Sequence, residues 1–128
     1  MKEKTINPVP GIYPPTADYV HAREVRDADR FVFVSGTMGL DPEGRPPENL
    51  EEQLELAWNN IRRILKEADM STENIVRLTS YLADRHYAEK NQMARTRALN
   101  GRVIPTTAIV VELLDPRWLI ELEVIAAA

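Results

Sequence analysis

The sequence has no cysteine among its 128 residues, which excludes disulfide bonds, thiolate nucleophiles and sulfur-ligated metal sites. It also lacks an uninterrupted apolar run of about 18 residues, the length needed to cross a bilayer as a helix. Its first residues contain no apolar stretch of signal-peptide length. We therefore expect a protein of a reducing compartment, the cytosol, without a membrane partner.

Neither the acidic nor the basic residues form a cluster in the sequence. The formal net charge is -4 and acidic residues alternate with basic ones throughout, so no basic stripe could follow a phosphate backbone. The aromatic residues are scattered as well, unlike the aromatic platforms of single-strand binders. Glycines form no dinucleotide or phosphate-loop motif, and His21 and His86 have no second ligand at metal-binding spacing. These patterns predict no nucleic-acid partner, no cofactor and no metal.

A chain of this length can build one hydrophobic core, so we expect a single domain over residues 1–128. Its 44% hydrophobic and 28% charged residues are typical of a globular protein. Residues 1–17 are expected to form an extended, proline-rich segment, because four prolines and a glycine lie within residues 7–16. An extra short strand near the N-terminus is compatible with this pattern.

Two segments have the spacing of apolar residues, three and four apart, that is typical of an amphipathic helix. The first covers about residues 50–69, with Asn49 as its N-cap and Glu52 reaching back as in a capping box. The second begins at Asp84, has a weaker apolar face and is expected to end at Gly101.

Segments rich in β-formers surround these helices. Residues 19–25, which mix apolar and polar residues without a helical period, form the first candidate strand, and residues 31–36 predict a buried strand. Residues 75–83 predict a strand with alternating faces. Residues 106–114 and 118–126, separated by the turn Asp115-Pro-Arg117, predict a terminal β-hairpin. The order strand, strand, helix, strand, helix, strand, strand predicts a two-layer α+β domain, a mixed sheet with both helices on one face.

Polar and apolar residues alternate in two of these strands. Glu121 and Glu123 are expected on one side of the last strand, with their positions roughly 7 Å apart. In residues 75–83 the same alternation places Arg77, Thr79 and Tyr81 on one face. A carboxylate that a pocket or a second subunit removes from water can accept or donate a proton near neutral pH. An ordinary solvent-facing strand is the alternative that this spacing leaves open.

Several segments of the chain, in this order and at this spacing, resemble the Rid family, the YjgF-like reactive-intermediate deaminases. The segments that carry the resemblance are Tyr19, Phe31–Gly36, Leu40–Gly44, Glu52-Gln53, Asn60-Ile61, Asn91 and Ile120–Ala126. The resemblance implies a chorismate-mutase-like α+β fold. It also implies a homotrimer that holds a small-molecule ligand in the cleft between neighbouring subunits.

Family members that act on reactive enamines and imines, such as 2-aminoacrylate, resemble this chain at five positions that the family uses in its site. These positions are Tyr19, Ser35, Gly36, Asn91 and Glu121. By this resemblance Glu121 would hold the water that attacks the imine carbon and releases ammonia. An imine carbon is already electrophilic, so one oriented water, a proton acceptor and a binding cleft suffice to accelerate its hydrolysis.

The chain departs from the family pattern at residues 105–108, which read Pro-Thr-Thr-Ala where the family's deaminases read Pro-Ala-Arg-Ser. Thr107 therefore stands at the position of the arginine, and its hydroxyl supplies neither the charge nor the paired donors that grip a carboxylate. Substrates of the aminoacrylate type are accordingly expected to bind poorly. Ile109 replaces a residue that is often small, and Ala94 replaces an expected aromatic, which predicts a reshaped and more apolar site.

A positive charge could still come from another arginine. Arg95, Arg97 and Arg102 lie on or just after the second helix and are candidates, although surface arginines paired with acidic neighbours are the simpler interpretation. Three functional hypotheses remain. The first is a deaminase-type hydrolase of an imine or enamine that uses Glu121 and has an altered substrate range because of Thr107. The second is a non-catalytic trimer that binds a metabolite or a protein partner. The third is a different small-molecule transformation in a biosynthetic or degradative pathway.

Overall fold

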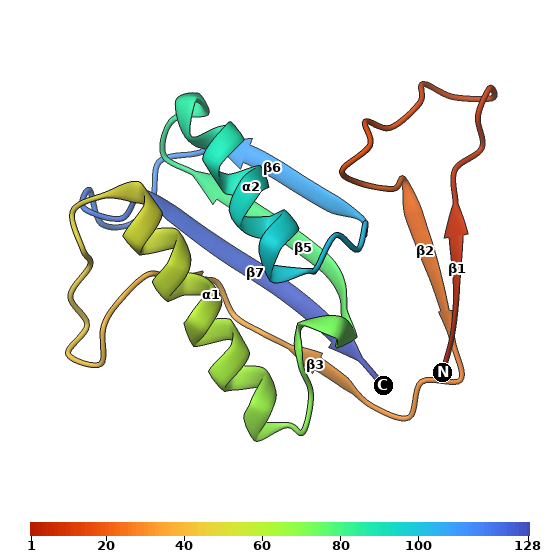
Figure 1. The fold of residues 1–128 in the computed structure, drawn as a ribbon, viewed down its shortest axis with the longest axis horizontal. Coiled ribbons are helices and arrows are strands. Elements are labelled where there is room, and N and C mark those ends of the chain that lie inside the picture. The colour runs from red at the N-terminus through yellow and green to blue at the C-terminus, as the bar shows by residue number, and fades with distance from the viewer.

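The computed structural model describes residues 1–128, which form two helices and seven strands (Figure 1). The strands are β1 (Lys2–Ile6), β2 (Ala22–Arg26), β3 (Phe31–Phe33), β4 (Thr37–Met38), β5 (Ile75–Leu82), β6 (Thr106–Val110) and β7 (Ile120–Ala127). The helices are α1 (Leu50–Glu67) and α2 (Ala88–Ala98), with short 3-10 turns at Thr72–Asn74 and Arg85–Tyr87. No helix is both long and apolar enough to cross a membrane, and the cytosolic location stays a prediction.

The main sheet has the strand order β3-β7-β5-β6, and β4 continues the pairing along β7. Strands β5 and β6 are parallel, whereas β7 is antiparallel to β3, β4 and β5. Both helices cross the same face of this sheet in Figure 1. The predicted two-layer α+β architecture, a mixed sheet with both helices on one face, is therefore confirmed.

The predicted terminal hairpin is wrong, because β6 and β7 are not neighbours. Strand β6 pairs in parallel with β5, as the β5-α2-β6 crossover requires, and β7 lies on the other side of β5. Strand β7 lies inside the sheet, because β3 and β4 pair with one of its edges and β5 with the other. Every second residue along β7 is buried. Alternation along a strand does not specify its partner, so the turn at residues 115–117 misled the prediction.

Helix α1 supplies six of the nineteen residues of the hydrophobic core. Leu54, Trp58, Ile61 and Leu65 are buried in the same hydrophobic cluster as residues of β7. Asn49 caps the helix as predicted, since its side chain accepts a hydrogen bond from the backbone N–H of Glu52 at 2.8 Å. The return bond from the Glu52 side chain is absent.

Helix α2 begins later than predicted. Asp84 caps the 3-10 turn that precedes it, accepting a hydrogen bond from the backbone N–H of His86 at 2.8 Å. The predicted stop at Gly101 is confirmed, since Asn100 and Gly101 have φ values of +52° and +77° just after the helix. The buried face of α2 includes Asn91 and Arg95, which a weak apolar period did not single out as core residues.

The N-terminal segment forms the extra strand that its sequence allowed. Strand β1 pairs antiparallel with β2 in a separate two-stranded sheet, which stands beside the main body in Figure 1. The proline-rich segment 7–16 follows β1 as a loop.

The predicted burial of residues 31–36 is only half right. Phe31 and Phe33 are 51% and 75% exposed, whereas Val34 is buried. The reason is that the two phenylalanines point to the side of the sheet that carries no helix, which we call the open face. The open face presents Phe31, Phe33, Arg77, Thr79, Tyr81, Thr107, Ile109, Glu121, Glu123 and Ile125.

Candidate functional site

Glu121 and Glu123 lie on the open face, as the alternation in β7 predicts. Glu121 is opposite Tyr81 of β5 on one side and Met38 of β4 on the other. The Tyr81 hydroxyl donates a hydrogen bond to Oε1 of Glu123 at 3.0 Å. This bond to a carboxylate raises the pKa of the Tyr81 phenol above its usual 10.0, so Tyr81 keeps its proton at neutral pH. Two carboxylates and one protonated phenol thus share one part of the sheet.

Gly36 allows the Glu121 carboxylate to lie directly against the backbone. A Cβ atom at residue 36 would lie 2.0 Å from Oε1 of Glu121, which is far closer than non-bonded carbon and oxygen atoms can approach. Both residues border a pocket of about 260 Å³, whose remaining walls come from neighbouring strands and from the chain after β6. These walls are Tyr81, Val111, Glu112, Leu113, Leu114 and Glu123. The pocket fits a water and a small organic molecule beside the Glu121 carboxylate.

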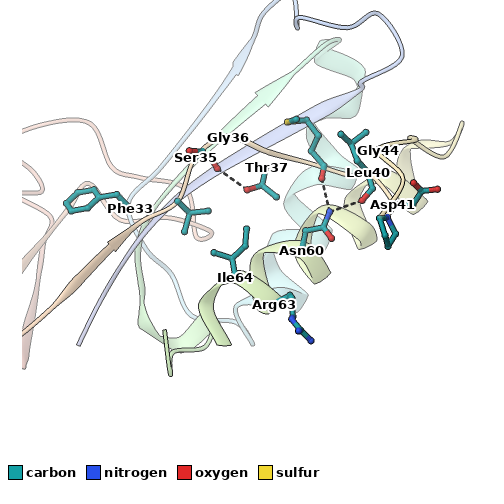
Figure 2. A pocket seen from close by; sticks show the side chains of 13 residues that line it. Phe33, Ser35, Gly36, Thr37, Leu40, Asp41, Gly44, Asn60, Arg63 and Ile64 are labelled. Carbon is teal, nitrogen blue, oxygen red and sulfur yellow. Dashed lines mark hydrogen bonds between the residues drawn. The ribbon is translucent and has the colours of Figure 1, made fainter. Parts of the chain in front are cut away.

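A second hollow, of about 690 Å³, lies on the other side of Gly36, between the β3–β4 segment and α1 (Figure 2). Ser35 belongs to this hollow and not to the pocket of Glu121. The hollow has fixed walls, because the Asn60 amide donates hydrogen bonds to the carbonyl oxygens of Met38 and Leu40 at 3.1 and 3.0 Å. The structure therefore brings Gly36 to Glu121 and leaves the Ser35 side chain apart from it.

Thr107 lies on β6, two strands away from Glu121. It is in register with Thr79 of β5, which is in turn in register with Glu123 of β7. Strand spacing and rise separate Thr107 from Glu121 by about 12 Å. Nη2 of Arg77 donates a hydrogen bond to Oγ1 of Thr107 at 2.7 Å. Within one chain Thr107 thus shares the open face with Glu121 without contacting it.

Ile109 and Tyr19 lie on the Thr107 side of the sheet. Ile109 is 44% exposed and in register with Tyr81. Tyr19 packs edge-on against His21 with ring centroids 5.9 Å apart. The N–H of Val20 donates to the carbonyl of Ile104 at 3.4 Å, which places Tyr19 beside the segment that enters β6.

Asn91 and the arginines of α2 lie in the helical layer, on the opposite side of the sheet from Glu121. Asn91 is 2% exposed and is buried in that layer. Arg95 is buried in an ion pair with Asp18. Burial works to raise the pKa of Asp18, but hydrogen bonds from Thr16 and the backbone and the Arg95 charge outweigh it, so the pKa is lowered.

None of the arginine substitutes considered from the sequence lies beside Glu121 within this chain, and their role toward a ligand stays a prediction. Arg95 is paired with Asp18, and Arg102 donates to the carbonyl oxygens of Thr72 and Ile75 at 3.1 and 3.3 Å. Arg97 is exposed on α2, in the same layer. The residues that the sequence did not select are Arg77 and Tyr81. Their alternation in β5 placed them on the correct face, but only the pairing of β5 with β6 and β7 shows what they contact.

Comparisons with known proteins agree with this architecture. A family model described as "Endoribonuclease L-PSP" matches residues 12–128. A RutC family protein of Aquifex aeolicus is 33% identical over 115 residues, which cover 88% of this chain and 90% of the relative. The 2-iminobutanoate/2-iminopropanoate deaminase of Rattus norvegicus is 33% identical over 101 residues, 77% of this chain and 73% of that protein.

A solved structure extends the likeness to the whole chain. The Rid family protein YyfB of Yersinia pestis superposes with a TM-score of 0.85 over 100% of both chains, at 22% identity. At this identity the likeness concerns the fold alone, which here includes the small N-terminal sheet.

Proposed function

The chain belongs to the endoribonuclease L-PSP family, which includes the Rid deaminases, and from this premise we propose that it hydrolyses the C=N bond of a small imine or of its enamine tautomer. Its fold is the chorismate-mutase-like α+β fold of that family. The observation that carries the proposal is the Glu121 carboxylate, seated against Gly36 at the edge of a small pocket. The iminobutanoate deaminase named above supplies the reaction type.

The proposed reaction needs one water and one proton acceptor. Glu121 orients the water and takes its proton as the oxygen attacks the imine carbon, and the nitrogen gains a proton. The tetrahedral intermediate then loses its C–N bond, so the products are a carbonyl compound and ammonia. Tyr81, which stays protonated, has its hydroxyl directed to Glu123 and helps to hold the polar edge of the pocket in place.

We further propose a homotrimer in which the open face meets neighbouring subunits. Phe31 and Phe33 are large, exposed and stacked on each other with centroids 6.3 Å apart, which favours burial in an interface. Thr107 and Glu121 are separated within one chain, so a cleft between two subunits could bring them to one ligand. We assign Tyr19, Thr107 and Ile109 to the lining of this cleft. Asn91 and Ser35, which face elsewhere, would support it without touching the ligand.

The acidity of the pocket argues against RNA as the substrate of this chain, although the family is named for an endoribonuclease. Glu112, Glu121 and Glu123 all border the pocket. Three carboxylates repel a phosphate backbone, and the chain as a whole carries a net charge of -4. A small imine carries at most one such charge, whereas an RNA backbone carries one at every phosphate.

The proposal is tested by generating imines in the presence of the protein and measuring the release of ammonia and of the carbonyl product. A small 2-imino acid and a neutral aliphatic imine are compared, because Thr107 predicts a substrate range that differs from that of family members with arginine. Faster hydrolysis of at least one imine, together with a particle mass of three chains by light scattering, is the expected result. A folded protein that accelerates neither reaction would instead favour the non-catalytic binding hypothesis.

Gly36→Ala is expected to lower this activity while the protein stays folded. The new methyl group would occupy the position of Oε1 of Glu121 and push the carboxylate away from the pocket. Because the displaced group is a side chain and not backbone, the main chain has no need to move. We expect roughly a 10- to 100-fold loss of kcat, since misplacing a catalytic group by about 1 Å has such an effect. Steady-state kinetics measure the loss.

The control is Gly36→Ala in a Glu121→Gln background, where the added substitution should lower kcat little further. Additive losses in the double variant would contradict the assigned contact.

A further inference from the structure

Arg77 is a half-buried arginine of the open face that has no carboxylate partner. Its side chain leaves β5 and reaches the adjacent strand β6, where Nη2 donates to Oγ1 of Thr107. None of the ion pairs within 4.0 Å in the structure includes Arg77. A guanidinium has five N–H donors, and the Thr107 bond uses one of them. A positive charge with free donors therefore lies beside the residue that replaces the family arginine.

The neighbouring acid on the same face does not neutralise this charge. Glu123 is on the adjacent strand β7, in register with Thr79. Its carboxylate accepts the hydrogen bond of Tyr81, which is four residues after Arg77 on β5, and it forms no ion pair with Arg77. Thr107 accepts from Arg77 through its oxygen, which leaves the hydroxyl proton of Thr107 free to point elsewhere. Thr79 adds a second hydroxyl on the same row of the sheet. A guanidinium with two hydroxyls beside it is a set of donors that suits a carboxylate.

We propose that Arg77, positioned by Thr107, binds the carboxylate of the substrate, so that this chain acts on imines or enamines that carry an acid group. The inference rests on the proposed function and names the substrate class of the same site. It also rests on the proposed cleft between subunits, because Thr107 lies about 12 Å from Glu121 within one chain, whereas a 2-imino acid has its carboxylate bonded directly to the imine carbon. It replaces the expectation from Thr107 alone that acidic substrates bind poorly. The guanidinium comes from β5, whereas in the family's deaminases it stands at the position of Thr107 on β6. The substrates of this chain are therefore expected to differ from theirs in where the carboxylate is bound, and both kinds carry one.

Binding of 2-oxobutanoate, a stable keto acid with the carboxylate of such a substrate, tests the proposal without any turnover. Isothermal titration with the wild-type protein is compared with Arg77→Met, and 2-butanone serves as the matched neutral probe. We expect Arg77→Met to weaken keto-acid binding by roughly 10- to 100-fold or more, since the loss of a single hydrogen bond between charged groups already has an effect of this size. Binding of the neutral ketone should not change.

Thr107 is tested as a positioning residue by variants that leave Arg77 intact. Thr107→Val removes the hydroxyl and should raise the dissociation constant and the KM of a 2-imino acid, with little effect on kcat. Thr107→Ser keeps the hydroxyl and should leave both the dissociation constant and the KM close to their wild-type values. In the Arg77→Met background, Thr107→Arg should recover keto-acid binding, because it returns a guanidinium to the same place on the open face.

The outcomes separate this inference from the hydrolase proposal. Unchanged keto-acid binding in both Arg77→Met and Thr107→Val, or no measurable binding of 2-oxobutanoate to the wild type, would overturn the role of Arg77 even if imines are hydrolysed. Keto-acid binding that depends on Arg77 in a protein that hydrolyses no imine would uphold the anion site and reject the hydrolase. Should Arg77→Met fail to fold, Thr107→Val decides alone.

Discussion

Glu121→Gln is expected to lower kcat for imine hydrolysis by about 10²- to 10⁴-fold, the usual contribution of a general base. Glutamine has the same shape and can still lie against Gly36, so the pocket keeps its form. Its amide cannot take the proton of the attacking water, however, and the attack must then proceed without a base. Steady-state kinetics with ammonia detection measure the loss. Circular dichroism and light scattering should show an unchanged fold and particle mass.

Glu123→Gln is the matched control for this prediction. It removes the charge of the second carboxylate on the same strand, and an amide oxygen can still accept the hydrogen bond of Tyr81. We expect a loss of kcat at least tenfold smaller than that of Glu121→Gln. The reverse order would show that Glu123 is the base and Glu121 a bystander. Equal and small losses would remove both carboxylates from the reaction.

The helices and the faces of the strands could be predicted because they depend on local periods. The spacing of Leu54, Trp58, Ile61 and Leu65 marks one side of α1, and alternation in β7 places Glu121 on the polar side. Strand order could not be predicted in this way. The β5-α2-β6 crossover and the central place of β7 depend on contacts between segments that lie far apart in the sequence.

The same limit applies to the site. The sequence could indicate Glu121 and the anomaly at Thr107, but the partner of Thr107 is Arg77, thirty residues away, and only the parallel register of β5 and β6 brings them together. The arginines near Thr107 in the sequence were the natural candidates, but Arg95 pairs with Asp18, Arg102 binds the carbonyl of Thr72, and Arg97 is exposed on α2. Asn91 is a site residue by resemblance, and the structure buries its side chain in the helical layer, so its contact with a ligand stays a prediction.

Gln53 connects helix α1 to the wall of the Glu121 pocket, although its sequence position suggests only a polar residue in the first turns of a helix. The side chain is 1% exposed. Its amide nitrogen donates to the carbonyl oxygens of Pro47 and Arg117 at 2.8 and 2.9 Å, and its oxygen accepts from the N–H of Leu119 at 2.9 Å. Gln53 therefore holds the end of the 111–119 loop, whose first residues line the pocket of Glu121.

Gln53→Leu is accordingly expected to lower the free energy of unfolding by about 3 kcal/mol or more, because three partly buried backbone groups lose their partner and each costs about 1–3 kcal/mol. Urea unfolding followed by circular dichroism measures the change, and kcat should fall as well because residues 111–114 lose their anchor. Gln92→Leu makes the same change at an exposed position of α2 and should alter stability by about 0.5 kcal/mol or less. If the two variants unfold at the same urea concentration, the Gln53 hydrogen bonds do not hold the loop. If Gln53→Leu is unstable yet retains full kcat, the loop does not shape the pocket, and Glu121 must act on a site whose other walls come from the neighbouring subunit.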